Sequence, residues 1–317
     1  MQLSFRAPDA ADIMLAPVFV IKEIKTMNRL IRASTTSLMF KPPLPRPLLS
    51  SFKPDESNCL FKTIDDDFMH CCLVCPYGQE TSLKNFDDNG QLLLFFHGNA
   101  DDIISSHSYC KWLADRLRMC VLVCDYPGYG FSSGEPSEEK MEHAALALMD
   151  FATTKLRKKP ADVYVMGKSI GSYPAVCVAS HPAFKDIRGL ILVSPVASAA
   201  RCVFEVKYLP DFIVQRLDAV ALANIKRIGE VRALVLAIHG SADDVVSVDN
   251  THALIAASSP DTYYPPLIVD AGHNDIECKF QSLFLETLHA FVKRTSEELL
   301  LSAAYEPYDS YDLLAEP

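Results

Sequence analysis

The chain alternates between short apolar runs and longer segments in which apolar residues recur at helical spacing. Each apolar run is nearly free of polar positions, a pattern typical of parallel strands that are buried on both faces of a sheet. The runs are QLLLFF (91–96), CVLVCDY (120–126), DVYVMG (162–167), GLILVS (189–194), ALVLAIHG (233–240) and PLIVD (266–270).

Amphipathic helical patterns lie between these runs, among them HSYCKWLADRLRM (107–119) and SEEKMEHAALALMDFATTKLRK (137–158). Strands and helices that alternate in this way predict an α/β fold, with a mostly parallel central sheet and helices on both faces. In such sheets the chemistry collects at the carboxyl ends of the strands. We therefore expect functional residues in the loops that follow the apolar runs.

The chain has 317 residues, 49% of them hydrophobic, which is enough for one large domain with an extension at each end. We assign the domain to residues 56–297. Residues 1–55 form an N-terminal extension that ends in a proline-rich connector, KPPLPRPLLSSFKP (41–54), and residues 298–317 form an acidic C-terminal tail.

The N-terminal extension also contains an amphipathic helical pattern. Its apolar stripe and its basic face consist, respectively, of Val20, Ile24, Met27 and Ile31, and of Lys22, Lys25, Arg29 and Arg32. This layout fits a basic helix on an anionic membrane surface, and it fits equally a helix docked by its apolar stripe onto the domain.

The net charge of −10, without a basic stripe, excludes a nucleic-acid binder. Ten cysteines are scattered through the chain, several inside strand-like runs, and the start lacks the layout of a signal peptide. We therefore expect reduced cysteines and a cytoplasmic protein, in peripheral contact with a membrane if the basic helix binds lipid. Cys71, Cys72 and Cys75 have no second pair at zinc-ligand spacing, so we expect no metal and no cofactor. No apolar run is long enough to span a bilayer.

A serine between two glycines follows the third apolar run. Gly167, Ser169 and Gly171 match the G-x-S-x-G turn, in which a strand bends sharply into a helix and presents the serine oxygen above the sheet edge. Side chains at the two glycines would collide with the neighbouring strand or helix. Ser169 is therefore a candidate nucleophile, against the alternative of a serine that caps a helix.

A nucleophilic serine needs a base and an acid, which follow it along the chain in this type of fold. His273 follows the last apolar run in a loop, whereas the other late histidines fall inside helical patterns, so His273 is the candidate base. The loop HGSADDVV (239–246) offers two candidate acids, Asp243 and Asp244. The backbone N–H groups of Ile170 and Asn99 would bind the oxyanion. We expect His97 and His239 to order the loops in which they lie.

Five segments, HGNA, DYPGYGFSSGEPSE, GKSIG, HGSADDVV and AGHNDIE, occur in this order between about residues 60 and 295. Together they resemble the serine hydrolases of the α/β-hydrolase superfamily. More narrowly, they are similar to the α/β-hydrolase-domain proteins of the seventeen class, which remove palmitate from cysteines of membrane-associated proteins. The resemblance implies the α/β-hydrolase fold, and it selects Asp243 as the acid, because the family's acid is the fifth residue counted from the histidine of the H-G-x-x-D loop.

Two features depart from that family. Its depalmitoylases carry an N-terminal cysteine cluster, whereas this chain has no cysteine before Cys59. Lys168 stands in the turn where the relatives have an uncharged polar residue, and the sequence assigns it no role. Fewer than forty residues separate the fourth and fifth apolar runs, so we expect a short lid, with Val203–Val214 as an apolar wall for a fatty chain.

The substrate expected from these features is an S-acylated protein, hydrolysed through an acyl-enzyme by a Ser–His–Asp triad. A bulky substrate suits a poorly covered site. A carboxylester hydrolase acting on monoacylglycerol or lysophospholipid would need the same triad, so it remains the alternative. A catalytically silent hydrolase fold that serves as an interaction module is a second alternative, disfavoured by the complete set of candidate residues.

Overall fold

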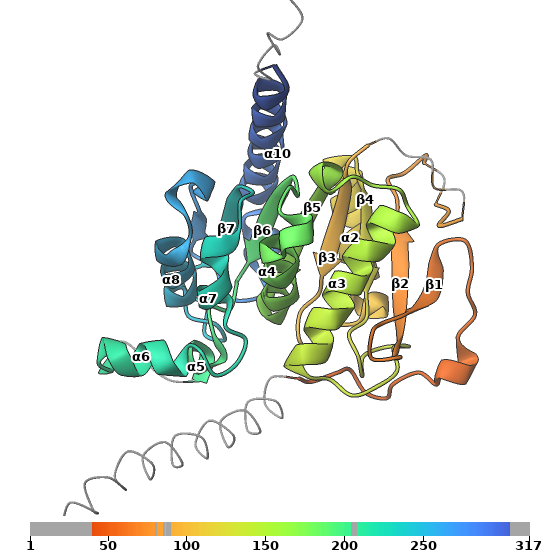
Figure 1. Cartoon of the computed structure of the whole chain (residues 1–317), viewed down its shortest axis with the longest axis horizontal. Coiled ribbons are helices and arrows are strands. Elements are labelled where there is room, and N and C mark those ends of the chain that lie inside the picture. The colour runs from red at the N-terminus through yellow and green to blue at the C-terminus, as the bar shows by residue number, and fades with distance from the viewer. Residues whose placement is uncertain (1–39, 80, 85, 87–89, 204–207, 305–317) are drawn as a thin grey trace, which may run out of the picture.

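A central sheet of eight strands organises the structure, a computed structural model that describes residues 40–304 except 80, 85, 87–89 and 204–207 (Figure 1). The strand order is β1-β2-β4-β3-β5-β6-β7-β8, and the pairs from β4 to β8 are parallel. The strands are β1 (Asn58–Lys62), β2 (Phe68–Val74), β3 (Leu92–Phe96), β4 (Cys120–Cys124), β5 (Val163–Lys168), β6 (Gly189–Val193), β7 (Val235–Gly240) and β8 (Leu267–Val269). All six predicted apolar runs form strands, and the expected α/β-hydrolase fold is confirmed.

Two hydrophobic layers cover the two faces of the sheet. Successive side chains of a strand point to opposite faces, so Leu92 and Leu94 of β3 pack in one layer while Leu93 and Phe95 pack in the other. Every residue of β3, β4 and β6 is buried. The continuous apolar runs in the sequence are therefore explained by burial on both faces rather than on one.

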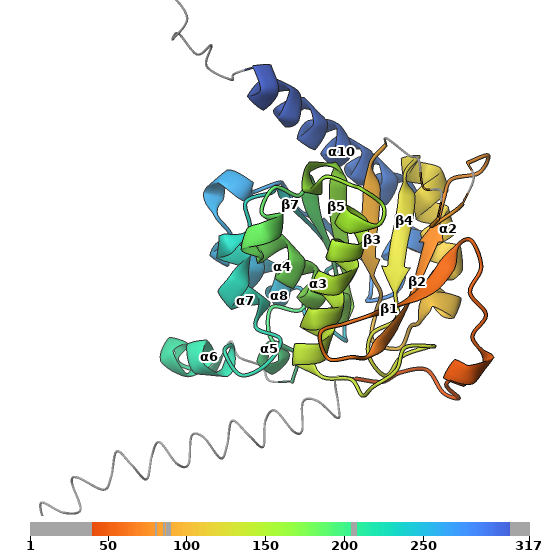
Figure 2. The ribbon, with the colours of Figure 1, turned by 45° about the vertical axis from the view of Figure 1, so that its right-hand side comes forward.

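Helices α3, α4, α7 and α8 pack in the first layer, and α2, α9 and α10 pack in the second (Figures 1 and 2). The α-helices of the structure are α2 (Ile103–Leu117), α3 (Glu138–Thr154), α4 (Ser172–Ser180), α5 (Ala199–Val203), α6 (Asp211–Leu217), α7 (Asn224–Arg227), α8 (Asp249–Ala257), α9 (Ile276–Lys279) and α10 (Gln281–Ala304). Short 3-10 turns lie at Leu49–Ser51, Pro160–Asp162, Ser169–Gly171, Pro182–Phe184, Ile228–Glu230 and Pro260–Thr262.

The first two strands form an antiparallel edge, which the sequence patterns did not predict. β2 pairs with both β1 and β4 in antiparallel register. At the end of the β2–β4 pair, Cys75 and Cys120 face each other with their Cα atoms 4.3 Å apart and form a disulfide. The expectation that all cysteines are reduced is therefore wrong for this pair, because the antiparallel register places two residues distant in sequence directly opposite each other. The other eight cysteines are free.

The lid between β6 and β7 consists of short helices, α5, α6 and α7, in agreement with the predicted short lid (Figure 2). The predicted basic helix, with Lys22, Lys25, Arg29 and Arg32, lies outside the described residues, and its contact with a membrane stays a prediction. Among the described residues, no helix is both long and apolar enough to cross a bilayer. Helix α10 continues through Ala304, past the predicted start of the tail at residue 298.

Helix α10 is attached to the sheet by Phe291, which is fully buried. Its ring lies 5.0 Å from the ring of Tyr264 and 6.3 Å from that of Tyr164. We expect Phe291→Ala to lower the free energy of unfolding by about 3–5 kcal/mol, measured by urea denaturation, because the substitution opens a cavity between α10 and the sheet. Lys293→Ala, at an exposed position of the same helix, is the control and should change stability by less than about 0.5 kcal/mol. A loss below about 1 kcal/mol in Phe291→Ala would contradict this account of how α10 is held.

Candidate active site

Ser169 sits at a strained point of the backbone between β5 and α4. Its backbone φ angle is +54°, in the left-handed region that residues with a side chain rarely adopt. A Cβ atom at Gly167 would collide with the carbonyl oxygen of Gly171, and one at Gly171 would collide with the carbonyl oxygen of Phe96. The two glycines therefore allow the start of α4 to lie directly against β5 and the end of β3, as the sequence pattern predicted. The turn places the Ser169 hydroxyl above the carboxyl end of the sheet.

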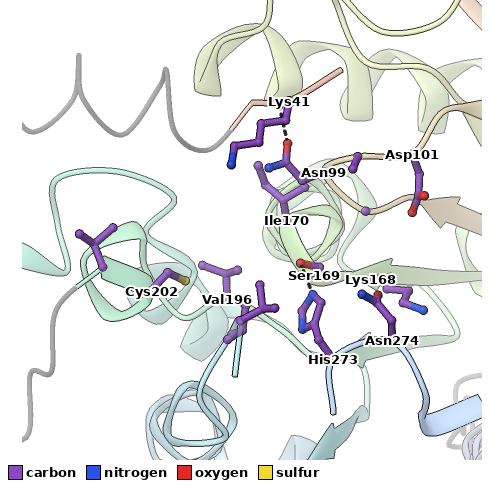
Figure 3. Close-up of a pocket in the computed structure, with 15 residues that line it drawn as sticks. Lys41, Asn99, Asp101, Lys168, Ser169, Ile170, Val196, Cys202, His273 and Asn274 are labelled. Atoms are coloured by element: carbon purple, nitrogen blue, oxygen red, sulfur yellow. Dashed lines mark hydrogen bonds between the residues drawn. The ribbon is translucent and has the colours of Figure 1, made fainter. Parts of the chain in front are cut away.

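Two hydrogen bonds connect Ser169 to His273 and Asp243 (Figure 3 draws the first). The Ser169 Oγ and His273 Nε2 atoms are 3.0 Å apart, and His273 Nδ1 lies 2.7 Å from Asp243 Oδ2. A carboxylate only accepts hydrogen bonds, so the proton is on Nδ1 and Nε2 is free to accept the serine proton. The three side chains come from the ends of β5, β7 and β8, which parallel pairing brings to one edge of the sheet.

The Asp243 carboxylate is buried and holds four hydrogen-bond contacts. Its Oδ1 atom accepts from the amides of Val245 at 2.9 Å and Val246 at 2.8 Å, and its Oδ2 atom lies 3.1 Å from His239 Nε2 in addition to the contact with His273. Burial by itself raises the pKa of Asp243, but the hydrogen bonds from His239, His273 and Val246 outweigh it and hold the pKa well below its ordinary value. Asp243 is therefore ionised throughout the neutral range, whereas Asp244, the other candidate acid, is exposed.

His239 orders the loop that carries Asp243, as the sequence analysis predicted. Its Nε2 atom lies 2.8 Å from the carbonyl oxygen of Val246 as well as near the Asp243 carboxylate, and both of these groups can only accept. Nε2 is therefore protonated, and Nδ1 accepts a hydrogen bond of 2.6 Å from the Thr251 hydroxyl. The loop from Asp243 to Val246 is closed around the imidazole of His239.

The two residues whose backbone amides are expected to bind an oxyanion, Ile170 and Asn99, line the same cavity as Ser169. Ile170 is the second residue of the 3-10 turn that begins at Ser169, so its N–H has no carbonyl partner within that turn. Asn99 lies in the loop after β3. His97, at the end of β3, is fully buried and packs its ring 4.2 Å from that of Tyr126, in agreement with its expected role in the turn.

The Asn99 side chain is fixed by two groups that the sequence analysis missed. Its Oδ1 atom accepts from the amide of Lys41 at 2.8 Å and from the hydroxyl of Tyr129 at 2.9 Å, and the Lys41 amide also donates to the Tyr129 oxygen at 3.1 Å. These three hydrogen bonds link Asn99, Lys41 and Tyr129 to one another and so fix the loop after β3. Tyr129 belongs to the quoted segment DYPGYGFSSGEPSE, but nothing in that pattern indicates which residue it contacts.

Ser169 and His273 open into a cavity of about 520 Å³ that is lined by both apolar and polar residues. The apolar lining residues are Ile170, Val196, Cys202, Val203, Val245 and Val246, of which Ile170 lies next to Asn99 (Figure 3). The remaining lining is mostly polar and includes Lys41, Asn99, Asp101, Lys168 and Asn274. Of the predicted apolar wall Val203–Val214, Val203 is the described residue that lines the cavity, whereas Phe212 is exposed.

Asp275 directly precedes α9, in the position of a helix cap. Its carboxylate, however, accepts from the upstream amide of Gly272 at 2.6 Å and pairs with Lys279 at 2.6 Å. Asp275 therefore closes the loop that carries His273, and its side chain caps none of the amides of α9.

The chain is similar to known proteins in both sequence and fold. A family model described as the alpha/beta hydrolase fold matches residues 91–219, a range that includes Asn99, Ser169 and Ile170. The chain is 36% identical over 213 residues to the alpha/beta hydrolase domain-containing protein 17B of Homo sapiens, with 66% of this chain and 67% of the relative covered. It is 35% identical over 247 residues to protein 17B of Xenopus laevis, with 77% of each chain covered.

Solved structures share the fold at low sequence identity. An esterase from Pyrococcus furiosus aligns with a TM-score of 0.59 and 16% identity, covering 81% of this chain and 98% of the esterase. A hydrolase from Agrobacterium vitis aligns with a TM-score of 0.57 and 16% identity over 75% of this chain and 100% of its own. At this identity the likeness shows the fold alone.

The environment of Asp243 generates a prediction about stability and pH. Because the pKa of Asp243 is lower in the folded chain than the ordinary value of 3.8, its ionised form stabilises the fold above that value. We expect Asp243→Asn to lower the free energy of unfolding by about 2 kcal/mol at pH 7, through weaker hydrogen bonds to the two histidines. The stabilisation is lost only as pH falls through the folded pKa, so the difference from the parent should be the same at pH 7 and pH 5. A difference that disappears between these values in urea denaturation would show that the folded chain raises the pKa of this carboxyl instead of lowering it.

Proposed function

The chain is a hydrolase that belongs to the α/β-hydrolase family, in the class of the domain-containing 17 proteins, and we propose that Ser169 is its nucleophile. The observation that carries the proposal is the pair of hydrogen bonds from Ser169 to His273 and from His273 to Asp243. An ordinary serine hydroxyl is a weak nucleophile, and an adjacent imidazole held in the correct tautomer by a carboxylate is what activates it.

In the first half of the reaction, the Ser169 oxygen attacks the carbonyl carbon of an acyl thioester while its proton moves to His273 Nε2. Asp243, ionised and hydrogen-bonded to Nδ1, stabilises the imidazolium that forms. The amides of Ile170 and Asn99 bind the oxyanion of the tetrahedral intermediate. Collapse of the intermediate breaks the carbon–sulfur bond and releases the thiolate, which needs little help from a general acid because thiols are acidic. An acyl group is left on Ser169.

In the second half, water replaces the thiol. His273 returns to its neutral form by losing its proton to the departing thiolate, and Nε2 then accepts a proton from a water molecule that attacks the acyl-enzyme. The same two amides bind the second oxyanion, and its collapse breaks the ester bond to Ser169. The proton on Nε2 passes to the serine oxygen, so the fatty acid leaves and the enzyme is restored.

We propose fatty acyl groups on protein cysteines as the substrate class. The apolar lining of the cavity, with Val196, Val203 and Val246, supports a bound hydrocarbon chain. The short lid, α5 to α7, leaves room for a substrate that is part of a protein. The resemblance of the motifs to the seventeen class, which implies removal of palmitate, supports the same substrate. A long-chain carboxylester hydrolase would use the same residues and is distinguished by experiment.

A fluorophosphonate probe tests the nucleophile. We expect the parent to be labelled and Ser169→Ala to lose labelling completely, because within residues 40–304, as far as they are described, no other hydroxyl is paired with His273. His273→Ala should lose nearly as much, since members of such a unit act together. Ser180→Ala, in α4 behind the turn, is the matched control and should label like the parent, because its hydroxyl is bonded to the carbonyl of Val176. Labelling of a folded Ser169→Ala protein at the parental rate would refute the assignment.

Turnover of three substrates tests the chemistry and the acyl group. We expect kcat/KM for a palmitoyl-thioester peptide to exceed that for an acetyl-thioester peptide and for a long-chain glycerol ester, with Ser169→Ala as the blank. Val203→Asp should reduce palmitoyl turnover about tenfold through loss of apolar contact, and leave acetyl turnover near the parental value. Preference for the glycerol ester would favour the lipase alternative, and equal turnover of acetyl and palmitoyl chains would remove the case for an acyl groove.

A further inference from the structure

Lys168, which the sequence analysis left without a role, forms an ion pair directly beside the nucleophile. Its Nζ atom lies 3.0 Å from Glu277 Oε1. Both side chains are largely buried, with exposed fractions of 16% and 11%. The two residues are 109 positions apart in sequence, and the pair joins the last residue of β5 to helix α9.

Each partner is attached to a different part of the candidate active site. Lys168 directly precedes Ser169, so its position and that of the strained turn move together. Glu277 follows His273 by four residues, at the end of the loop that Asp275 closes through Gly272. The ion pair is thus a direct side-chain connection between the turn that holds the nucleophile and the loop that holds the base.

A third element, helix α2, also contacts the Lys168–Glu277 ion pair. The Lys168 ammonium lies 5.4 Å from the centre of the Tyr109 ring, in the geometry of a cation–π contact. Tyr109 belongs to α2, which begins after Asp102 and therefore directly follows the loop of Asn99. Burial, and then the negative charge of Glu277, raise the pKa of the Tyr109 hydroxyl well above its ordinary value, so it stays neutral. Lys168 therefore contacts α9, which follows the His273 loop, and α2, which follows the Asn99 loop.

A buried ion pair is a poor source of stability, because desolvation of the two charges offsets most of their attraction. What such a pair does supply is a fixed geometry, since both charges are strongly disfavoured without their partner. The distance it fixes matters here, because proton transfer requires the Ser169 oxygen to stay within hydrogen-bond reach of His273 Nε2.

We propose that Lys168 and Glu277 are positioning residues that hold the Ser169 turn against the His273 loop, with two opposite charges that cancel each other next to the imidazole. The proposal rests on the proposed function, because it gives Ser169 and His273 the roles of nucleophile and base. It differs from that function in that neither Lys168 nor Glu277 exchanges a proton or a bond with the substrate.

The opposite charges of Lys168 and Glu277 can be tested through the pH dependence of the reaction rate. Other charged groups around His273 are Asp243, which contacts it directly, Lys41 and Asp101 in the cavity wall, and the exposed pair of Asp275 and Lys279. None of these changes when the Lys168–Glu277 pair is altered. Removing Lys168 leaves a carboxylate that favours the imidazolium, and removing Glu277 leaves an ammonium that disfavours it. The two single variants should therefore shift the acid limb of the pH–rate profile in opposite directions.

The experiment compares Lys168→Met, Glu277→Gln and the double variant in the full chain, with the fluorophosphonate labelling rate and hydrolysis of a short-chain p-nitrophenyl ester as readouts. A short ester avoids dependence on the acyl groove. Far-UV circular dichroism and thermal melting establish that each variant is folded. Because a single variant leaves one buried charge unpaired, the double variant, which is neutral, keeps the test valid if a single variant does not fold. Lys62→Met removes an exposed, ion-paired lysine at the end of β1 and is the control.

We expect each single variant to lower kcat about tenfold with KM changed by less than about twofold, because misplacement of the base affects the chemical step more than binding. The acid limb should move up by roughly half a pH unit in Lys168→Met and down by a similar amount in Glu277→Gln. In the double variant the acid limb should return to the parental position while kcat stays about as low as in a single variant, the non-additivity expected of a shared interaction. Lys62→Met should match the parent.

Parental kcat in the folded double variant would overturn the proposal, as would single variants whose acid limbs shift in the same direction or whose losses multiply in the double variant. These outcomes differ from failure of the proposed function. If Ser169→Ala is labelled like the parent, the nucleophile itself is wrong, whatever the Lys168 and Glu277 variants show.

Discussion

The close approach of three backbone segments at the Ser169 turn is the constraint on which the rest of the site depends. The first residues of α4 lie against β5 and against the end of β3 with no room for a Cβ atom at Gly167 or Gly171. This contact forces Ser169 into the left-handed region and directs its hydroxyl toward His273. It also sets the turn beside the loop of Asn99, so the proposed nucleophile and the two proposed oxyanion amides share one rigid frame.

Two kinds of interaction place Asp243, His273 and Asn99 next to the Ser169 turn. Parallel pairing of β5 to β8 delivers their loops to one edge of the sheet, which is a property of the fold. The exact placement then comes from local hydrogen bonds. His239 and two amides fix Asp243, Tyr129 and the Lys41 amide fix Asn99, and Asp275 closes the loop behind His273. The sheet brings the loops close together, and buried polar contacts fix the positions of the side chains within them.

The features that could be predicted from the sequence are those encoded locally. Buried parallel strands require unbroken apolar runs, and a tight turn requires glycines at fixed spacing, so the six strands and the Ser169 turn follow from short segments. Asp243 and Asp244 could not be separated by their residues alone, because both follow the same strand, and a family resemblance was needed. The β1–β2 edge, the Cys75–Cys120 disulfide and the contact of Lys168 with Glu277 join residues far apart in sequence, and no local pattern specifies such pairs.

The contact of the Lys41 amide with Asn99 has a consequence for delivery of the substrate. The described chain begins at Phe40, which is buried in the core, and Lys41 already lines the cavity that contains Ser169. Whatever binds the residues ahead of Phe40 is thereby tethered at the rim of the cavity. A tether of this kind raises the local concentration of a ligand without adding any contact to the site. A ligand held by those residues would therefore meet the cavity that contains Ser169 more often than a ligand free in solution.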